Sequence, residues 1–142
     1  MKLIVEEIRE NFSLYQQILV TENLDIIAIR PRIYKHQNPA GQLQIKITDL
    51  NNKLIAESDQ INIIDINSAA YSHTYYKFPI VTQLLKNQEY RIYLHNFNYT
   101  FSELNWAGWC KALDLVKTNC SYAPCANFNS PFDFEIWIKK RG

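Results

Sequence analysis

Glycine is scarce in this chain of 142 residues, where it occurs only as Gly41, Gly108 and Gly142. Loops that cradle nucleotide phosphates need several closely spaced glycines, because a Cβ atom would hold the backbone away from the phosphate. The P-loop and the dinucleotide-binding fingerprint are therefore excluded.

Long apolar runs and blocks of a single charge are also missing. No apolar stretch approaches the roughly 20 residues that a helix needs to cross a bilayer, and "MKLIVEEIRENF" has acidic residues where a secretory signal would stay apolar. Fifteen Lys and Arg balance fourteen Asp and Glu, with a formal net charge of +1, and neither sign forms a block that could follow a phosphate backbone. We expect a soluble protein, made in the host cytoplasm, that binds neither membrane nor nucleic acid.

The residue types that hold metals or carry out catalysis are scattered. His36, His73 and His95 form no H-x-H or H-x-x-x-H pair, so we expect no metal and no cofactor. The carboxylates are likewise dispersed, without the pairing typical of a glycosidase. Asp49 and Asn51 could offer oxygens to calcium, but a hairpin turn explains the same "D-x-N" pattern. We expect a protein that is not an enzyme.

The cysteines are odd in number: Cys110, Cys120 and Cys125. Cys120 and Cys125 are close enough in sequence to form a loop disulfide in an oxidising environment, whereas a reducing cytoplasm would keep them as free thiols. The spacing fits no standard zinc finger, and nothing in the sequence pairs Cys110 with a histidine as a catalytic nucleophile would require.

Apolar residues recur with a period of two, which is typical of half-buried strands. Two stretches predict strands, "QLQIKITDL" with Leu43, Ile45 and Ile47 inward and Gln42, Gln44, Lys46 and Thr48 outward, and "EYRIYLHNFN" with Tyr90, Ile92 and Leu94 on one face and Arg91, Tyr93 and His95 on the other. A third, "FDFEIWIKKR", has Phe132, Phe134, Ile136 and Ile138 inward and Asp133, Glu135 and Lys139 outward. This leaves Trp137 on the polar side, where it invites a partner.

Polar turns separate these strands. Asn51 and Asn52 suit a tight turn, so residues 43–49 should fold back antiparallel onto 54–58. "LLKNQEY" breaks the chain again before the strand that contains Tyr90. Antiparallel hairpins without long amphipathic helices argue against a parallel α/β sheet.

Two segments lack strand periodicity and predict long loops. "IDINSAAYSHTYY" offers Asn67 or Ser68 as the cap of a short helical turn, and "TNCSYAPCANFNSP" contains Pro124 and Pro131. The sequence therefore predicts an all-β protein, with residues 1–142 forming a single antiparallel β-sandwich domain that carries one or two long loops.

The order "IIAIRPRIYKHQNPAGQLQIKITDLNNKLIAES…YYKFPI…LLKNQEYRIYLHNF…WAGW", over roughly residues 24 to 110, resembles the small jelly-roll modules of phage virion proteins and of carbohydrate-binding modules. The shared pattern is "L-x-I-x-I", a polar "D-x-N" turn, "L-I-A-x-S", an aromatic "Y-x-F" strand, and "Y-R-I-Y-L" near a tryptophan. The resemblance implies a jelly-roll β-sandwich with a role in binding or in capsid and tail structure. It carries over no catalytic residue.

The stretch "NYTFSELNWAGWCK", residues 98 to 111, concentrates aromatic residues. In a strand, Trp106 and Gly108 point to one side and Ala107 and Trp109 to the other, so the two tryptophans cannot both be core residues. The sequence predicts an aromatic shelf and a contact surface formed, together with Trp137, by Tyr99, Phe101, Glu103, Asn105, Trp106 and Trp109. Such rings suit a sugar face, a protein interface, or the end of the protein's own core.

Two functions follow from these observations. The first is a structural protein of a virus particle, a capsid decoration or tail component, which contacts other virion proteins or itself as a homo-oligomer. The second is a lectin-like module that binds a host-surface glycan at the shelf of residues 99–109. Self-association would favour the first function, and sugar binding would favour the second.

Overall fold

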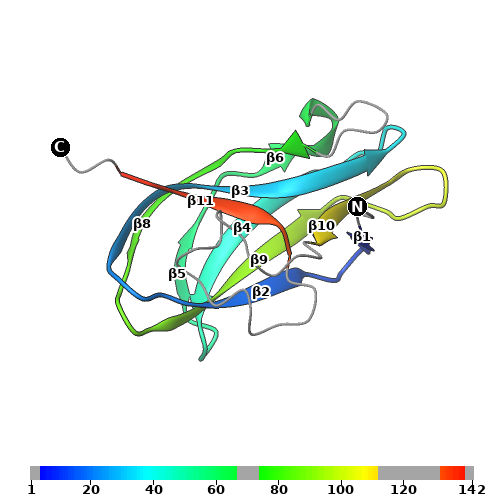
Figure 1. The fold of residues 1–142 in the computed structure, drawn as a ribbon. Coiled ribbons are helices and arrows are strands. Elements are labelled where there is room, and N and C mark those ends of the chain that lie inside the picture. The colour runs from blue at the N-terminus through cyan, green and yellow to red at the C-terminus, as the bar shows by residue number, and fades with distance from the viewer. Residues whose placement is uncertain (1–3, 67–73, 112–131, 140–142) are drawn as a thin grey trace.

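The chain folds into two antiparallel β-sheets that lie one over the other, as a computed structural model shows (Figure 1). The structure describes residues 4–66, 74–111 and 132–139. The predicted loop containing Cys120 and Cys125, and the predicted helix cap at Asn67 or Ser68, lie outside these residues.

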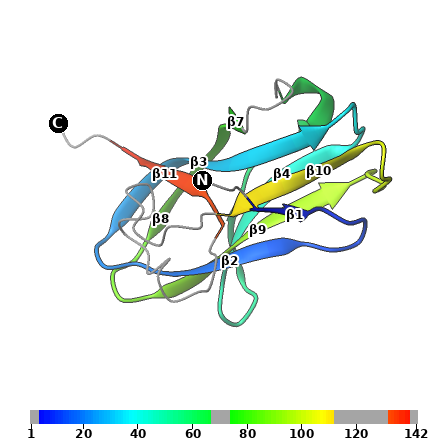
Figure 2. The same cartoon turned by 45° about the vertical axis from the view of Figure 1, so that its right-hand side comes forward.

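The first sheet is built around the long strand β3. Its strands are β1 (Ile4–Glu7), β10 (Trp106–Lys111), β3 (Leu24–His36), β11 (Phe134–Ile138), β7 (Thr74–Tyr75) and β8 (Phe78–Leu84). One side of β3 pairs with β10 and β11, which follow one another along the strand, and the other side pairs with β7 and β8. Figure 2 shows β1 beside β10 at the edge of this sheet.

The second sheet pairs strands from the middle of the chain. Its order is β2 (Leu14–Leu19), β9 (Glu89–Phe97), β4 (Gln42–Asp49) and β5 (Leu54–Glu57), with β6 (Ile61–Asn62) also pairing with β4. A single 3₁₀ turn, η1 (Ile63–Asp65), follows β6, and the described residues contain no α-helix.

The paths β1-β10-β3-β8 and β2-β9-β4-β5 have the strand order of a jelly roll. Among these eight strands, those that follow one another in the chain alternate between the sheets except at the β4–β5 hairpin. The predicted all-β antiparallel sandwich is confirmed, and so is the hairpin from 43–49 to 54–58. Asn52, at φ 64°, occupies the left-handed conformation of its turn. The turn at "LLKNQEY" does not form a hairpin, since it carries the chain from β8 in one sheet to β9 in the other.

The hydrophobic core lies between the two sheets and follows the predicted period of two. Leu43, Ile45 and Ile47 are fully buried, as are Ile92 and Leu94 on the neighbouring strand. The core also contains Ile18, Ile26, Ile29, Ile33, Phe78, Leu84, Trp109 and Phe134. The sheet faces that the sequence predicted as inward are therefore the faces that pack together.

Asp133 is a correction, because it was predicted to face solvent and is 1% exposed. Its Oδ2 accepts a 2.8 Å hydrogen bond from the Tyr75 hydroxyl and lies 3.4 Å from Arg32 Nη1. A carboxylate can be buried when hydrogen bonds and an opposite charge replace its water. Gln44 and Thr48, also predicted outward, are buried too, and Gln44 donates to the Ser58 carbonyl oxygen at 2.6 Å.

Candidate contact surfaces

The predicted shelf at residues 98 to 111 does not form as a unit. Tyr99 is 4% exposed and Trp109 is completely buried, so neither ring can meet a ligand or a partner, and their inclusion in the shelf was wrong. Trp106 projects to the other face of β10, which confirms that the two tryptophans separate. The predicted shelf therefore loses two of its four aromatic rings.

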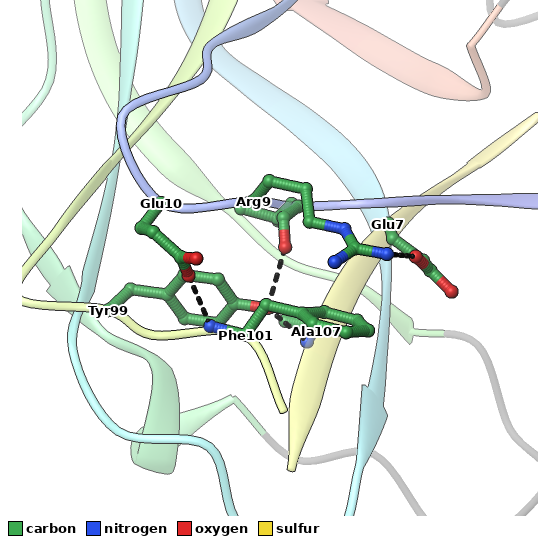
Figure 3. Close-up of polar contacts among 7 residues, drawn as sticks. Glu7, Arg9, Glu10, Tyr99, Phe101 and Ala107 are labelled. Carbon is green, nitrogen blue, oxygen red and sulfur yellow. Dashed lines mark hydrogen bonds and ion pairs between the residues drawn. The ribbon is translucent and has the colours of Figure 1, made fainter. Parts of the chain in front are cut away.

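Tyr99 is buried between the ends of two strands, and its hydroxyl is hydrogen-bonded to the backbone of both. Its hydroxyl donates a 2.8 Å hydrogen bond to the Ile8 carbonyl oxygen and accepts a 3.1 Å hydrogen bond from the Ala107 N–H (Figure 3). Burial raises the pKa of this hydroxyl, which keeps it protonated as a donor. Tyr99 thus joins the chain after β1 to the start of β10.

Trp109 is buried because it faces the other sheet and the segment that leads into β11. Its ring stacks on Phe132 with centroids 4.3 Å apart and meets the edge of Phe134. Its indole N–H donates a 2.9 Å hydrogen bond to the Asp133 carbonyl oxygen. A buried tryptophan normally needs such an acceptor for its N–H, and here the core supplies one.

Trp106 lies on the outer face of the first sheet in a cluster of partly exposed aromatic rings. The strand register pairs it directly with His36, and Tyr34 follows two positions away on β3. The Trp106 ring centroid is 5.0 Å from that of Tyr34, 5.8 Å from that of His36 and 6.4 Å from that of Phe101. We call Tyr34, His36, Phe101 and Trp106 the Trp106 platform.

The loop before β10 borders this platform with polar groups. The Asn105 side-chain oxygen accepts a 3.1 Å hydrogen bond from the Asn38 N–H, and Glu103 is exposed. Arg9 places its guanidinium carbon 3.5 Å from the Phe101 ring centroid, and a carboxylate oxygen of Glu10 accepts the Phe101 N–H at 2.6 Å (Figure 3). These contacts hold Phe101 beside Trp106.

A second apolar surface crosses three neighbouring strands at the other end of the same sheet. Ile27 on β3, Val81 on β8 and Trp137 on β11 alternate with the buried residues Ile26, Ile80 and Ile136 and therefore project outward. Trp137 pairs with Ala28, which pairs on its other side with Pro79. We call Ile27, Pro79, Val81 and Trp137 the Trp137 strip, and it confirms that Trp137 faces outward, at 38% exposed.

Charged groups surround the tryptophan of this strip. The Arg30 guanidinium carbon lies 4.6 Å, and the Lys77 Nζ 5.2 Å, from a Trp137 ring centroid. Arg30 also pairs with Glu135 at 2.5 Å, and Glu135 accepts the Trp137 indole N–H at 3.3 Å. Two cations thus already interact with the face of this ring, while its aliphatic neighbours remain open.

The outer face of the second sheet carries a stack of rings that the sequence did not single out. Tyr15 and Tyr93 have centroids 5.2 Å apart, and Tyr93 and His95 stack at 5.3 Å. The Arg91 guanidinium carbon lies 5.4 Å from the Tyr15 ring centroid, and Ser13 contacts His95 Nδ1. These rings interact with one another across β2 and β9, which is the cross-strand packing that stabilises a sheet.

The described residues offer neither a reactive cysteine nor a metal-binding cluster. Cys110 is buried, and burial raises its thiol pKa to about 12, which disfavours the reactive thiolate. Within residues 4–66, 74–111 and 132–139, no group of three or more His, Cys, Asp or Glu side chains is placed to hold a metal ion. The same residues include no helix that is long and apolar enough to span a bilayer.

Asp49 Oδ1 accepts the backbone N–H groups of Asn51 and Lys53. The "D-x-N" pattern thus serves the hairpin turn.

Comparisons of the chain with family models, with curated proteins and with solved structures found no match.

Sequence reasoning missed Tyr34, His36, Ile27 and Val81 as surface residues. "NLDIIAIR" and "KFPIV" contain consecutive apolar residues, so the outward members cannot be told from the inward ones by periodicity. Tyr34 and His36 do alternate with Ile33 and Lys35, which indicates that they share one face of a strand. Their neighbour Trp106, however, is about 70 positions away in the sequence, so no local pattern links it to them. Only the β10–β3 register brings them together.

Proposed function

We propose that this chain is a non-enzymatic structural protein of a virus particle, made in the host cytoplasm, which decorates a capsid or forms part of a tail. It acts through protein–protein contacts at the Trp137 strip. The observation that carries the proposal is the exposure of apolar side chains on one sheet face, where Val81 is 83% exposed and Trp137 is partly exposed. The jelly-roll strand order agrees with the resemblance to phage virion modules.

The chemistry of the strip favours a protein partner. The side chains of Ile27, Pro79 and Val81 are aliphatic and offer no aromatic ring and no hydrogen-bonding group. The free energy gained when they are buried therefore comes from apolar packing alone. Tryptophan is one of the residue types enriched among the few that dominate interface energy. The Arg30–Glu135 ion pair and the 3.3 Å hydrogen bond from Gln83 to Asp25 lie on the same sheet face and supply a polar rim.

The partner is another virion protein or a second copy of this chain, and sedimentation velocity tests the second case directly. We expect wild-type protein to associate with rising concentration. Val81→Glu should weaken that association at least tenfold, because a buried unpaired carboxylate is costly. Phe12→Glu is the matched control, since Phe12 is 69% exposed outside the strip and should lose nothing.

Particle incorporation tests the function itself. Particles of the virus that encodes the chain should contain it in stoichiometric amount by mass spectrometry after density-gradient purification. The Val81→Glu chain should be depleted from them, while Phe12→Glu should be retained. If the wild-type chain is monomeric and is also absent from purified particles, the proposal is wrong.

A further inference from the structure

We infer that the Trp106 platform is a binding site for an uncharged saccharide. This goes beyond the structural role proposed above, because the platform lies at the opposite end of the first sheet from the Trp137 strip. It also differs from the sequence prediction in its membership. Tyr34 and His36 take the places of the buried Tyr99 and Trp109.

Three of the four platform rings, those of Tyr34, His36 and Trp106, belong to the paired strands β3 and β10. The Trp106 and His36 planes differ by 28°, and those of Tyr34 and His36 by 24°. The Tyr34 hydroxyl lies 3.4 Å from His36 Nδ1, two positions further along β3, so the tyrosine leans along the strand. The four side chains are partly exposed, and the C–H patch of a pyranose ring stacks on exposed aromatic surface of this kind.

Gly108 makes room for the indole. It lies two positions after Trp106 on the same face of β10, and a Cβ at Gly108 would come within 3.2 Å of Trp106 Cζ3. The same Cβ would meet Val5 Cγ1 at 2.3 Å. With no side chain at this position, the Trp106 indole lies along β10 beside Gly108.

The one cation beside the platform, among the residues named above, is already paired within the chain. Arg9 pairs with Glu7 at 2.6 Å and covers Phe101, and the Glu10 carboxylate accepts the Phe101 N–H, which lowers the pKa of Glu10. An anionic ligand would meet the carboxylates of Glu10 and Glu103, while the Arg9 guanidinium is already paired with Glu7. An uncharged ligand fits, because it loses no ion pair on binding.

Groups that can bind hydroxyls lie around the rings. Tyr34 has a hydroxyl, His36 has ring nitrogens, and Asn105 has an amide at the edge of the platform. Sugar hydroxyls need such directed partners when the ring stacks, since an unpaired polar group is costly to bury. The Trp137 strip has aliphatic residues instead, and its tryptophan face is already engaged by Arg30 and Lys77.

A glycan array covering animal, plant and bacterial saccharides, followed by calorimetry with each uncharged oligosaccharide found, tests the inference. We expect wild-type protein to bind at least one uncharged glycan. Trp106→Ala should weaken that binding at least tenfold, and Trp106→Phe, which keeps an aromatic face, should weaken it less. Circular dichroism melts of both variants separate lost binding from lost folding.

Leu104→Ser is the discriminating control, because Leu104 is 71% exposed in the loop beside the platform but carries no ring. It should keep glycan binding within twofold. The inference is overturned if wild-type protein binds no uncharged glycan, or if folded Trp106→Ala binds as well as wild type. Equal losses in Leu104→Ser and Trp106→Ala would also overturn it, because they would show that glycan binding depends on the whole loop and not on the rings.

The two proposals fail separately. Val81→Glu should keep glycan binding while losing association, and Trp106→Ala should do the reverse. If the protein binds glycans but is absent from particles, the saccharide site is supported and the virion role is contradicted.

Discussion

The indole N–H of Trp109 is hydrogen-bonded to the carbonyl oxygen of Asp133 at 2.9 Å, and this contact ties β10 to the segment that leads into β11. The Lys111–Phe132 bridge and the hydrogen bond from the Asp133 N–H to the Cys110 carbonyl oxygen, at 2.8 Å, reinforce the same junction. One tryptophan therefore helps to place the final strand, which carries Trp137 to the outer face.

Trp109→Ala should destabilise the protein severely. Removing a fully buried indole leaves a cavity and takes away one hydrogen bond to the Asp133 carbonyl oxygen, which still accepts the Arg32 backbone N–H at 3.0 Å. We expect the free energy of unfolding to fall by about 3–5 kcal/mol. Urea denaturation followed by circular dichroism measures this. Trp137→Ala, at a partly exposed site, should cost much less, and equal losses in the two variants would contradict the assigned core role.

Tyr99→Phe should lower stability without changing the shape of the core. The variant keeps the ring but leaves the Ile8 carbonyl oxygen and the Ala107 N–H without their shared partner, which we expect to cost about 1–3 kcal/mol in unfolding free energy. Tyr15→Phe, at a 47% exposed ring, is the matched control and should melt like wild type. Identical melting of both variants would show that the Tyr99 hydroxyl is dispensable.

Gly108→Ala should disturb the pairing of β1 with β10. The new methyl group would meet the Glu6 carbonyl oxygen at 2.9 Å as well as Val5, and overpacking of this kind costs about 1–3 kcal/mol. Amide hydrogen exchange in β1 should be faster in the variant than in wild type, while exchange in β4 of the second sheet should be the same in both. Unchanged protection of β1 would mean that the strand moves aside without loss.

We expect the free energy of unfolding to decline in mild acid because of His95. Burial first, and the charge of Lys46 second, hold the folded-state pKa of His95 below its ordinary value of 6.5, while Glu57 opposes them. Above pH 6.5 the ring is neutral in both states, so it adds no pH dependence. As the pH falls below 6.5 the unfolded chain binds the proton first, and the free energy of unfolding decreases until the folded-state pKa is passed.

Urea unfolding of wild type and His95→Gln between pH 7.5 and 5, the window around that reference pKa, checks this prediction. The difference between the two should shrink as the pH falls, because only wild type loses stability through this ring. A constant difference across the range would contradict the assigned shift.

The fold was largely predictable from local patterns. Alternation in residues 43–47 and 90–94 defined the buried faces, because side chains in a strand point to opposite sides at every step. Asn51 and Asn52 defined the hairpin, because asparagine adopts the left-handed backbone that tight turns require.

The sequence by itself therefore determined the all-β class, the strand faces and the separation of Trp106 from Trp109. Only the tertiary structure decided which rings of residues 98–111 reach solvent. Tyr99 enters the core because Ile8 and Ala107, far from each other in sequence, present a carbonyl oxygen and an N–H at one place. Trp106 gains Tyr34 and His36 through the β10–β3 register. Such contacts depend on which strands become neighbours, and local patterns carry no record of pairing between distant segments.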